Sequence, residues 1–304
     1  MELLLSVFVS DLLPVFLVAG VGFLLARFLG VNVKVVATVA FHALAPCLVF
    51  FMTVSAGLGG LQFGRMALFC VLALIVKGLV AKLVAWPLRL DRQTSSGLLL
   101  VVMFSNSGNY GLPVVLFAFG SEALPHATVY FVTSAVLAYT LGVLVAASGR
   151  LDPREALLGI ARVPAVYGLV AAVVVLAAGV TVPLPLMRPI ELMSDATLPM
   201  MMLVLGMQLE RAAMPTQPGA AAVAVGLSLL FAPVVALGLA WAVGLEGPAR
   251  QAGIVQASMP TAVVASVLAL EFDVAPAFVT SVVFLTTVLS PLTLTVLIAY
   301  LQTV

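Results

Sequence analysis

The side chains best suited to bind a ligand lie in the middle of a long apolar run. The stretch "SNSGNYGLP", residues 105–113, contains two asparagines, two serines, two glycines, a tyrosine and a proline. At membrane depth, polar residues and irregular backbone survive only where they are buried in protein or line a water-filled cavity. The stretch therefore predicts a binding site within a membrane-embedded fold.

A second stretch, "QASMPT" (residues 256–261), has the same character in the other half of the chain. Proline has no N–H, so the carbonyl four residues earlier loses its helical partner. That carbonyl belongs to Asn109 for Pro113 and to Gln256 for Pro260, and both residues have amide side chains that could support the gap. Because the glycines of the first stretch also permit non-helical backbone, we predict a helix break at each place.

Each break creates two helix ends near the bilayer centre. The new N-terminus has free N–H groups and a partial positive charge that favour an anion, whereas the carbonyl end favours a cation or a proton donor. Neither 105–113 nor 256–262 contains Lys or Arg. We therefore expect helix dipoles and polar side chains to bind a small carboxylate, with Asn106 as the direct ligand and Tyr110 shaping the cavity. The predicted substrate-binding residues are Asn106, Ser107, Gly108, Asn109, Tyr110, Pro113, Gln256, Ser258, Pro260 and Thr261.

Two ionisable residues, His42 and Asp195, precede mid-span prolines by four positions. Ionisable groups within a membrane are functional candidates, so either residue could couple transport to protons or could only pack. Sodium coupling is a second alternative, with oxygens from Asn106, Ser258 and Thr261, although no acidic residue adjoins them. Passive transport driven by the membrane potential is a third. Cysteine and histidine spacing predicts no metal site, and no cofactor is expected.

Composition excludes a soluble protein. Of 304 residues, 63% are hydrophobic and only 8% charged, whereas soluble domains have about 25% charged residues. The net charge of +1 without a basic patch argues against nucleic-acid binding. With two histidines and no catalytic motif, the chain is not expected to be an enzyme.

We expect an all-α integral membrane fold, because the apolar runs divide the chain into ten segments long enough to cross a bilayer. Residues 1–147 and 157–304 would each contain five spans. Since five is odd, the halves would have opposite orientation and form two inverted repeats, with helices four and nine broken and crossing. The predicted spans are 7–29, 34–56, 64–87, 94–119, 124–147, 157–179, 188–209, 219–243, 249–271 and 276–302.

Positive charges predict that both termini face outside the cell. Loops after odd-numbered spans carry more Lys and Arg than the others, which assigns them to the cytoplasm. We expect Lys77 and Lys82 to extend toward the membrane surface, and Asp11 to be wet near a span end. The residues that set the orientation are Arg27, Lys34, Arg89, Arg92, Arg150, Arg154 and Arg211 on one side, against Arg65, Arg188 and Arg250.

Several motifs resemble the auxin efflux carrier family. "NSGNYGLPVVLFAFG" (106–120) is similar to its fourth-helix motif, and "GIVQASMPTAVVASVLALEFDV" (253–274) to its ninth. "LAPCLVF" and "LPMMMLVLG" resemble its second and seventh helices, so the likeness covers nearly the whole chain. Ser105 replaces the proline that plant members have before the crossover asparagine, and Val163–Pro164 replaces Asn-Pro at the sixth helix.

The resemblance implies a secondary carrier of small organic anions, such as malonate or an auxin-like acid, in the plasma (inner) membrane. Asn106 and Pro260 match the family's crossover residues. Helices one, two, six and seven would form a scaffold that makes a homodimer through the second and seventh, and the others a transport domain. The short loops resemble bacterial members. Alternating access by an elevator movement is expected, with rocking as the alternative mechanism. A ligand-sensing membrane module without transport is the alternative function.

Overall fold

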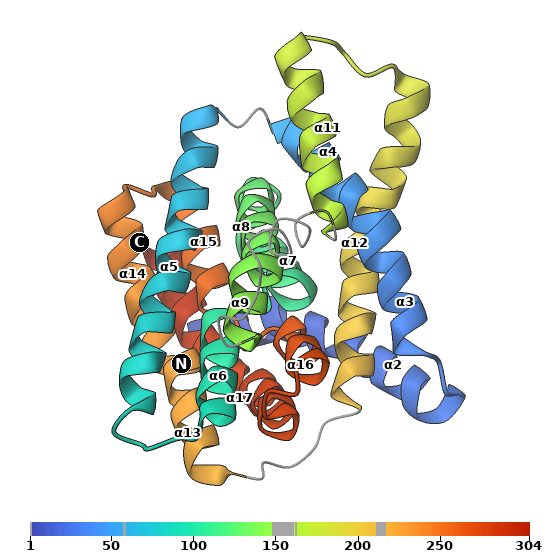
Figure 1. The fold of residues 1–304 in the computed structure, drawn as a ribbon. Coiled ribbons are helices and arrows are strands. Elements are labelled where there is room, and N and C mark those ends of the chain that lie inside the picture. Colours follow the sequence, from blue (N-terminus) through green and yellow to red (C-terminus); the bar gives the residue numbers. More distant parts are fainter. Residues whose placement is uncertain (1, 57–58, 148–160, 162, 211–216) are drawn as a thin grey trace.

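The structure, a computed structural model, describes residues 2–56, 59–147, 161, 163–210 and 217–304. In these ranges every regular element is a helix (Figure 1). Seven helical runs are long and apolar enough to cross a membrane. They are Glu2–Leu29 (α1–η1–α2), Val33–Ser55 (α3–η2–α4), Gly60–Ala85 (α5), Leu124–Ala146 (α8–η4–α9), Leu184–Leu209 (α12), Pro218–Val243 (α13–η5–α14) and Pro276–Thr303 (α17).

Several of these runs contain a π-helical turn, labelled η. η1 (Phe8–Leu12) lies between α1 (Glu2–Val7) and α2 (Leu13–Leu29), and η2 (Ala40–Leu44) lies between α3 (Val33–Val39) and α4 (Ala45–Ala56). η4 (Ala138–Gly142) lies between α8 (Leu124–Leu137) and α9 (Val143–Ala146). η5 (Leu227–Phe231) lies between α13 (Pro218–Gly226) and α14 (Ala232–Val243). A shorter apolar helix, α11, spans Pro164–Ala178.

The remaining helices come in two interrupted pairs. α6 (Arg92–Met103) is followed by η3 (Ser107–Gly111) and α7 (Leu112–Phe119), and α15 (Gly247–Ala257) by α16 (Val263–Glu271). The predicted loop 148–156, the start of the predicted span 157–179, and Arg150, Arg154 and Arg211 lie outside the described residues.

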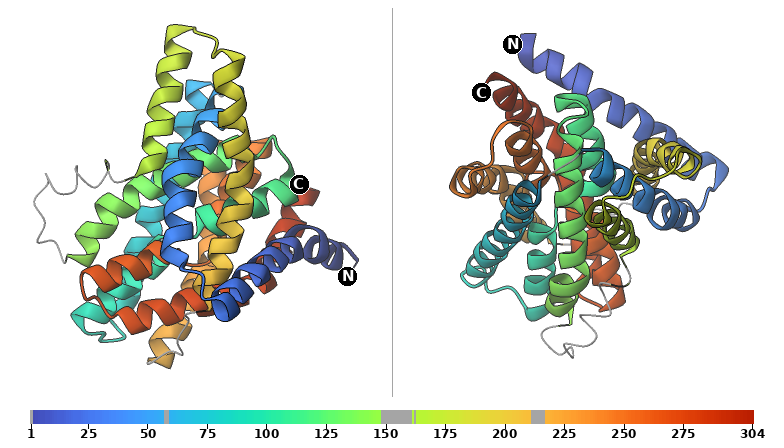
Figure 2. Two further views of the ribbon diagram at one scale, coloured as in Figure 1. Left: turned by 90° about the vertical axis from the view of Figure 1, so that its right-hand side faces the viewer. Right: turned by 90° about the horizontal axis from the view of Figure 1, so that it is seen from above.

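Two groups of helices surround the site (Figures 1 and 2). In one group, α2 packs on α12 and α4 on α11. In the α2–α12 contact, a Cβ on Gly206 would collide with the backbone carbonyl of Ala19, and one on Gly22 with that of Leu203. Small residues let the backbones of membrane helices approach closely, so these glycines determine how tightly this pair packs. The other group contains α5–α9 and α13–α17.

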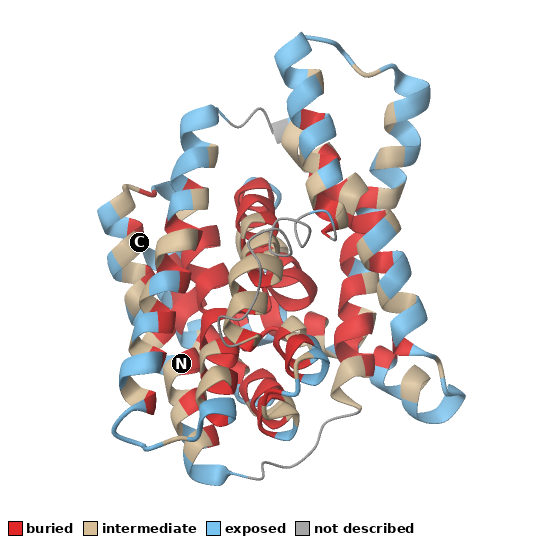
Figure 3. Cartoon of the chain, viewed as in Figure 1, coloured by how far each residue is buried: buried red, intermediate tan, exposed pale blue. Residues whose placement is uncertain are grey.

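Burial is concentrated between the helices of the second group, while outward faces and the tips of α11 and α12 are exposed (Figure 3). Lys77 on α5 is only 1% exposed, and its Nζ donates to the Ala257 carbonyl at 3.3 Å. The expectation that Lys77 extends to the membrane surface is therefore wrong. Position along a span indicates depth, but the rotation of α5 turns this side chain toward α15.

The expectation that Asp11 is in contact with water is also wrong, because this residue is only 6% exposed. Its Oδ2 accepts a hydrogen bond from Gln302 Nε2 at 3.0 Å. The contact joins the first helical run to the end of α17, a neighbour that lies 291 positions away in the sequence. Such a partner has no local signature.

The start of α6 is set by a side-chain cap. Asp91 Oδ1 accepts from the Thr94 backbone N–H at 3.0 Å, and Oδ2 from the Thr94 hydroxyl at 2.6 Å. These hydrogen bonds favour the carboxylate and lower the pKa of Asp91. They also satisfy a free N–H of the first helical turn, so α6 starts at a defined residue outside the apolar region.

Candidate functional site

The two interruptions meet in a short antiparallel pairing. Ser105 and Thr261 form the bridge. The Asn106 N–H donates to the Pro260 carbonyl at 2.7 Å, and the Ala262 N–H donates to the Phe104 carbonyl at 2.8 Å. Backbone groups that leave a helix within an apolar environment need such partners. The pairing therefore lets both chains leave the helical conformation at the same point.

The carbonyls at the ends of α6 and α15 are also satisfied by side chains. Ser105 Oγ donates to the Gln256 carbonyl at 2.8 Å, and Thr261 Oγ1 donates to the Val101 carbonyl at 2.8 Å. The Gln256 carbonyl is the one released by Pro260, and a hydroxyl from the other break occupies it. Together with Lys77 at Ala257, these donors cap the negative ends of both helices.

A cavity of about 430 Å³ lies beside this pairing. Its walls come from both helix groups. One wall is made by α3, η2, the start of α11 and Gln208 of α12, and the other by residues 104–109, α8, η4 and the start of α16. The cavity is therefore placed where relative movement of the two groups would change its access.

Four predicted site residues line the cavity, namely Asn106, Ser107, Gly108 and Asn109. Asn106 is 5% exposed, and its Nδ2 has no hydrogen-bond partner among the described residues. A buried donor without a partner is energetically unfavourable. Because Asn106 lines the cavity, this amide is a candidate donor to a ligand that accepts hydrogen bonds.

The other predicted residues do not line the cavity but lie behind it. Tyr110 is fully buried, with its hydroxyl 3.2 Å from Ser290 Oγ and its ring edge-to-face on Phe16. The backbone of Gly111 lies against the Gln256 side chain, so a Cβ there would collide with it. The residues in this supporting layer are Tyr110, Pro113, Gln256, Ser258, Pro260 and Thr261.

His42 and Asp195 are separated by the fold. His42 on η2 lines the cavity, with its Nδ1 3.2 Å from the Thr38 carbonyl. Asp195 is exposed on α12 and does not line the cavity. It precedes Gln208, the α12 residue at the cavity, by 13 positions, or about 20 Å along a helix.

Sequence reasoning missed several polar residues of the cavity wall, among them Lys34, Thr38 and Gln208. Lys34 and Thr38 precede His42 at intervals of four, which places all three on one face of a helix, so this signal was available in the sequence. Gln208 Oε1 accepts from Asn109 Nδ2 at 3.3 Å. The absence of Lys and Arg near the two breaks in sequence therefore does not mean that the cavity lacks a basic group.

Residues 150–298 match a family described as membrane transport protein. The chain is 28% identical over 254 residues to an uncharacterized transporter of Methanothermobacter thermautotrophicus, with 83% of each protein covered. It is 24% identical over 267 residues to an uncharacterized transporter of Methanocaldococcus jannaschii, covering 85% of this chain and 86% of that protein. A segment of 118 residues, 38% of this chain, is 35% identical to auxin efflux carrier component 3a of Oryza sativa subsp. japonica, of which it covers 19%.

The chain is therefore similar to membrane transporters over most of its length and to an auxin efflux carrier over part of it. This confirms the resemblance found in its motifs, and the family and its relatives are transporters rather than enzymes. In this chain, Ser105 has a structural role at the position where plant members have proline, because its hydroxyl caps Gln256. Val163 and Pro164, the departure at the sixth helix, line the cavity.

Proposed function

We propose that the transporter carries a small organic anion, a carboxylate of the size of malonate or an auxin-like acid, and that it binds the anion at the crossover. The observation that carries the proposal is the unpartnered Nδ2 of Asn106 in the cavity wall. A carboxylate offers only acceptors and is a strong partner for an amide donor.

The charges around the cavity support the preference for an anion. Lys34 brings a positive charge to the wall. The helix formed by η3 and α7 begins at Ser107, in the cavity wall, and Asn106 makes no side-chain cap there. The positive end of this helix dipole therefore also favours an anion. A positive charge at a cavity also raises the local concentration of anionic ligands.

We propose an inverted repeat of two five-helix halves, residues 1–147 and 157–304, as the basis of transport. The seven long runs, α11 and the two interrupted pairs give ten helical segments among the described residues, and this number supports the proposal. The group with α2, α4, α11 and α12 would be the scaffold, and the other group would carry the crossover past it in an elevator movement. A cavity walled by both groups supports this division.

A proton is the coupling ion that the cavity supports best. His42 is in the wall, and a histidine ring can accept or donate a proton. Asp195 is exposed elsewhere on α12, and Ser258 and Thr261, two of the oxygen donors expected for sodium, do not line the cavity. Uptake that follows an imposed pH gradient in sodium-free buffer is the expected result.

For the assembly we propose a plasma-membrane homodimer through the helices at 34–56 and 188–209, with both termini outside. Cysteine pairs engineered into α12 should crosslink two copies, and labels at both ends should be accessible from outside in intact cells. A monomer in crosslinking and mass measurements would contradict the dimer.

Binding and flux together test the function. Purified protein should be stabilised by mono- or dicarboxylates and not by the matching neutral amides, and proteoliposomes should take up the stabilising compound saturably. Equal binding of neutral isosteres would refute the anion site. Binding without flux would favour the ligand-sensing alternative, and unitary conductance a channel.

A further inference from the structure

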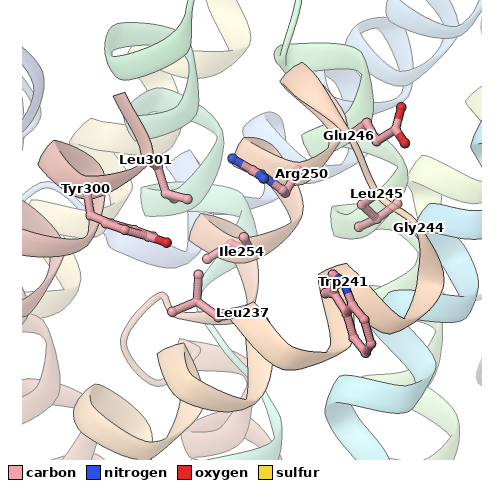
Figure 4. A pocket seen from close by; sticks show the side chains of 9 residues that line it. All are labelled: Leu237, Trp241, Gly244, Leu245, Glu246, Arg250, Ile254, Tyr300 and Leu301. Atoms are coloured by element: carbon pink, nitrogen blue, oxygen red, sulfur yellow. The ribbon is translucent and has the colours of Figure 1, made fainter. Parts of the chain in front are cut away.

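A second hollow lies away from the crossover, where α14, α15 and α17 meet. It has a volume of about 550 Å³ and is lined by the ends of α14 and α17 and the first turns of α15 (Figure 4). Its lining residues are Leu237, Trp241, Gly244, Leu245, Glu246, Arg250, Ile254, Tyr300 and Leu301. The crossover residues do not contribute to it, so its chemistry is separate from that of the proposed anion site.

The charged group of this hollow is Arg250. Its guanidinium points into the hollow toward Tyr300, while the carboxylate of Glu246 points away (Figure 4). In the part of the chain that the structure describes, no ion pair or side-chain hydrogen bond is found for Arg250. A second guanidinium, that of Arg65, donates to the Gly244 carbonyl at 3.3 Å on the rim. The positive charge at this end of the helices is therefore not neutralised by a neighbouring acid.

The neighbouring residues place the hollow at the level of lipid headgroups. Trp241 and Tyr300 are 86% and 50% exposed, and each lies within four residues of the end of a helix long enough to span a membrane. Aromatic residues of this kind are enriched where a bilayer meets water. Leu237 and Ile254 continue the lining as an apolar surface. The hollow therefore combines a cationic side chain with an apolar surface.

We propose that this hollow binds one anionic phospholipid. Its phosphate would accept hydrogen bonds from the guanidinium of Arg250, and from the hydroxyl of Tyr300. Arginine suits a phosphate because its planar fork can donate two hydrogen bonds at once. An acyl chain would lie along Leu237 and Ile254, which is why a lipid fits this surface better than a free phosphate ion.

Lipid retention tests the proposal. The detergent-purified full-length protein would be titrated with dioleoylphosphatidylglycerol, dioleoylglycerol or inorganic phosphate, and followed by native mass spectrometry and thermal unfolding. We expect the phospholipid to remain bound and to raise the unfolding temperature. Arg250→Gln should weaken its binding roughly 10- to 150-fold, as expected for a charge-assisted contact. Tyr300→Phe should weaken it less.

The matched control is Arg188→Gln, which removes an exposed arginine on α12 in the other helix group. It should bind the phospholipid as the wild type does. The proposal is overturned if Arg250→Gln and Tyr300→Phe both bind the phospholipid with unchanged affinity. It is also overturned if Arg188→Gln loses as much affinity for the phospholipid as Arg250→Gln does. Equal retention of dioleoylglycerol, or equal stabilisation by inorganic phosphate, would overturn it as well.

Discussion

Replacing Asn106 by alanine separates a ligand-binding role from a structural one. The Asn106 side chain forms no hydrogen bond with the described residues, and its Nδ2 is buried without a partner. Removing it therefore breaks no hydrogen bond among the residues that the structure describes. We expect the free energy of unfolding to change by less than about 1 kcal/mol, because replacing an unsatisfied polar group with an apolar one is close to neutral.

The effect on binding should be much larger. A hydrogen bond to a charged partner contributes about 1.5–3 kcal/mol, which corresponds to a roughly 10- to 150-fold loss of affinity. Calorimetric titration with the stabilising carboxylate would measure this loss, and thermal unfolding without ligand would measure stability. Uptake into proteoliposomes should fall with the affinity.

Thr261→Val is the contrasting variant. It removes the hydroxyl that donates to the Val101 carbonyl behind the cavity, so it should lower stability by about 1–3 kcal/mol while affinity changes less than in Asn106→Ala. Wild-type affinity in a folded Asn106→Ala protein would refute the assignment of Asn106 as the ligand. So would a loss of stability as large as that of Thr261→Val.

Three further predictions concern stability. Gly206→Ala should reduce the yield of folded protein, because the new Cβ would collide with the backbone of α2. Gly20→Ala should be tolerated, because there is open space around Gly20. Equal yields of the two variants would contradict the close contact between α2 and α12. Lys77→Ala should cost about 2–4 kcal/mol, since it leaves a cavity and an uncapped carbonyl at the end of α15. Asp91→Ala should cost about 1 kcal/mol at pH 7. Because the pKa of Asp91 is lowered in the folded state, its stabilisation is complete above the ordinary aspartate value and is lost as pH falls through the folded pKa. The difference in free energy of unfolding between the wild type and Asp91→Ala, measured over a pH series, should therefore become smaller in acid. A difference that does not change with pH would contradict the charged cap.

The class of this protein and the location of its helix interruptions can be read from the sequence alone. Apolar runs long enough for a bilayer and very few charges permit only a membrane fold, and this signal is carried by each segment separately. Pro260 and the glycines beside Asn106 act on the backbone within one helical turn, so the places where helices end can be read locally. The motifs around these places also identified the transporter family.

Only the tertiary structure decided which side chains share the cavity. Asn106 lines it and Tyr110 does not, because Asn106 lies in the non-helical break before η3 whereas Tyr110 lies within η3 and packs on Phe16 and Ser290. The packing of whole helices also buries Lys77 against α15 and brings Gln208 to Asn109. Contacts between residues about 100 and 180 positions apart depend on helix crossing and packing, and no local pattern of residues encodes those.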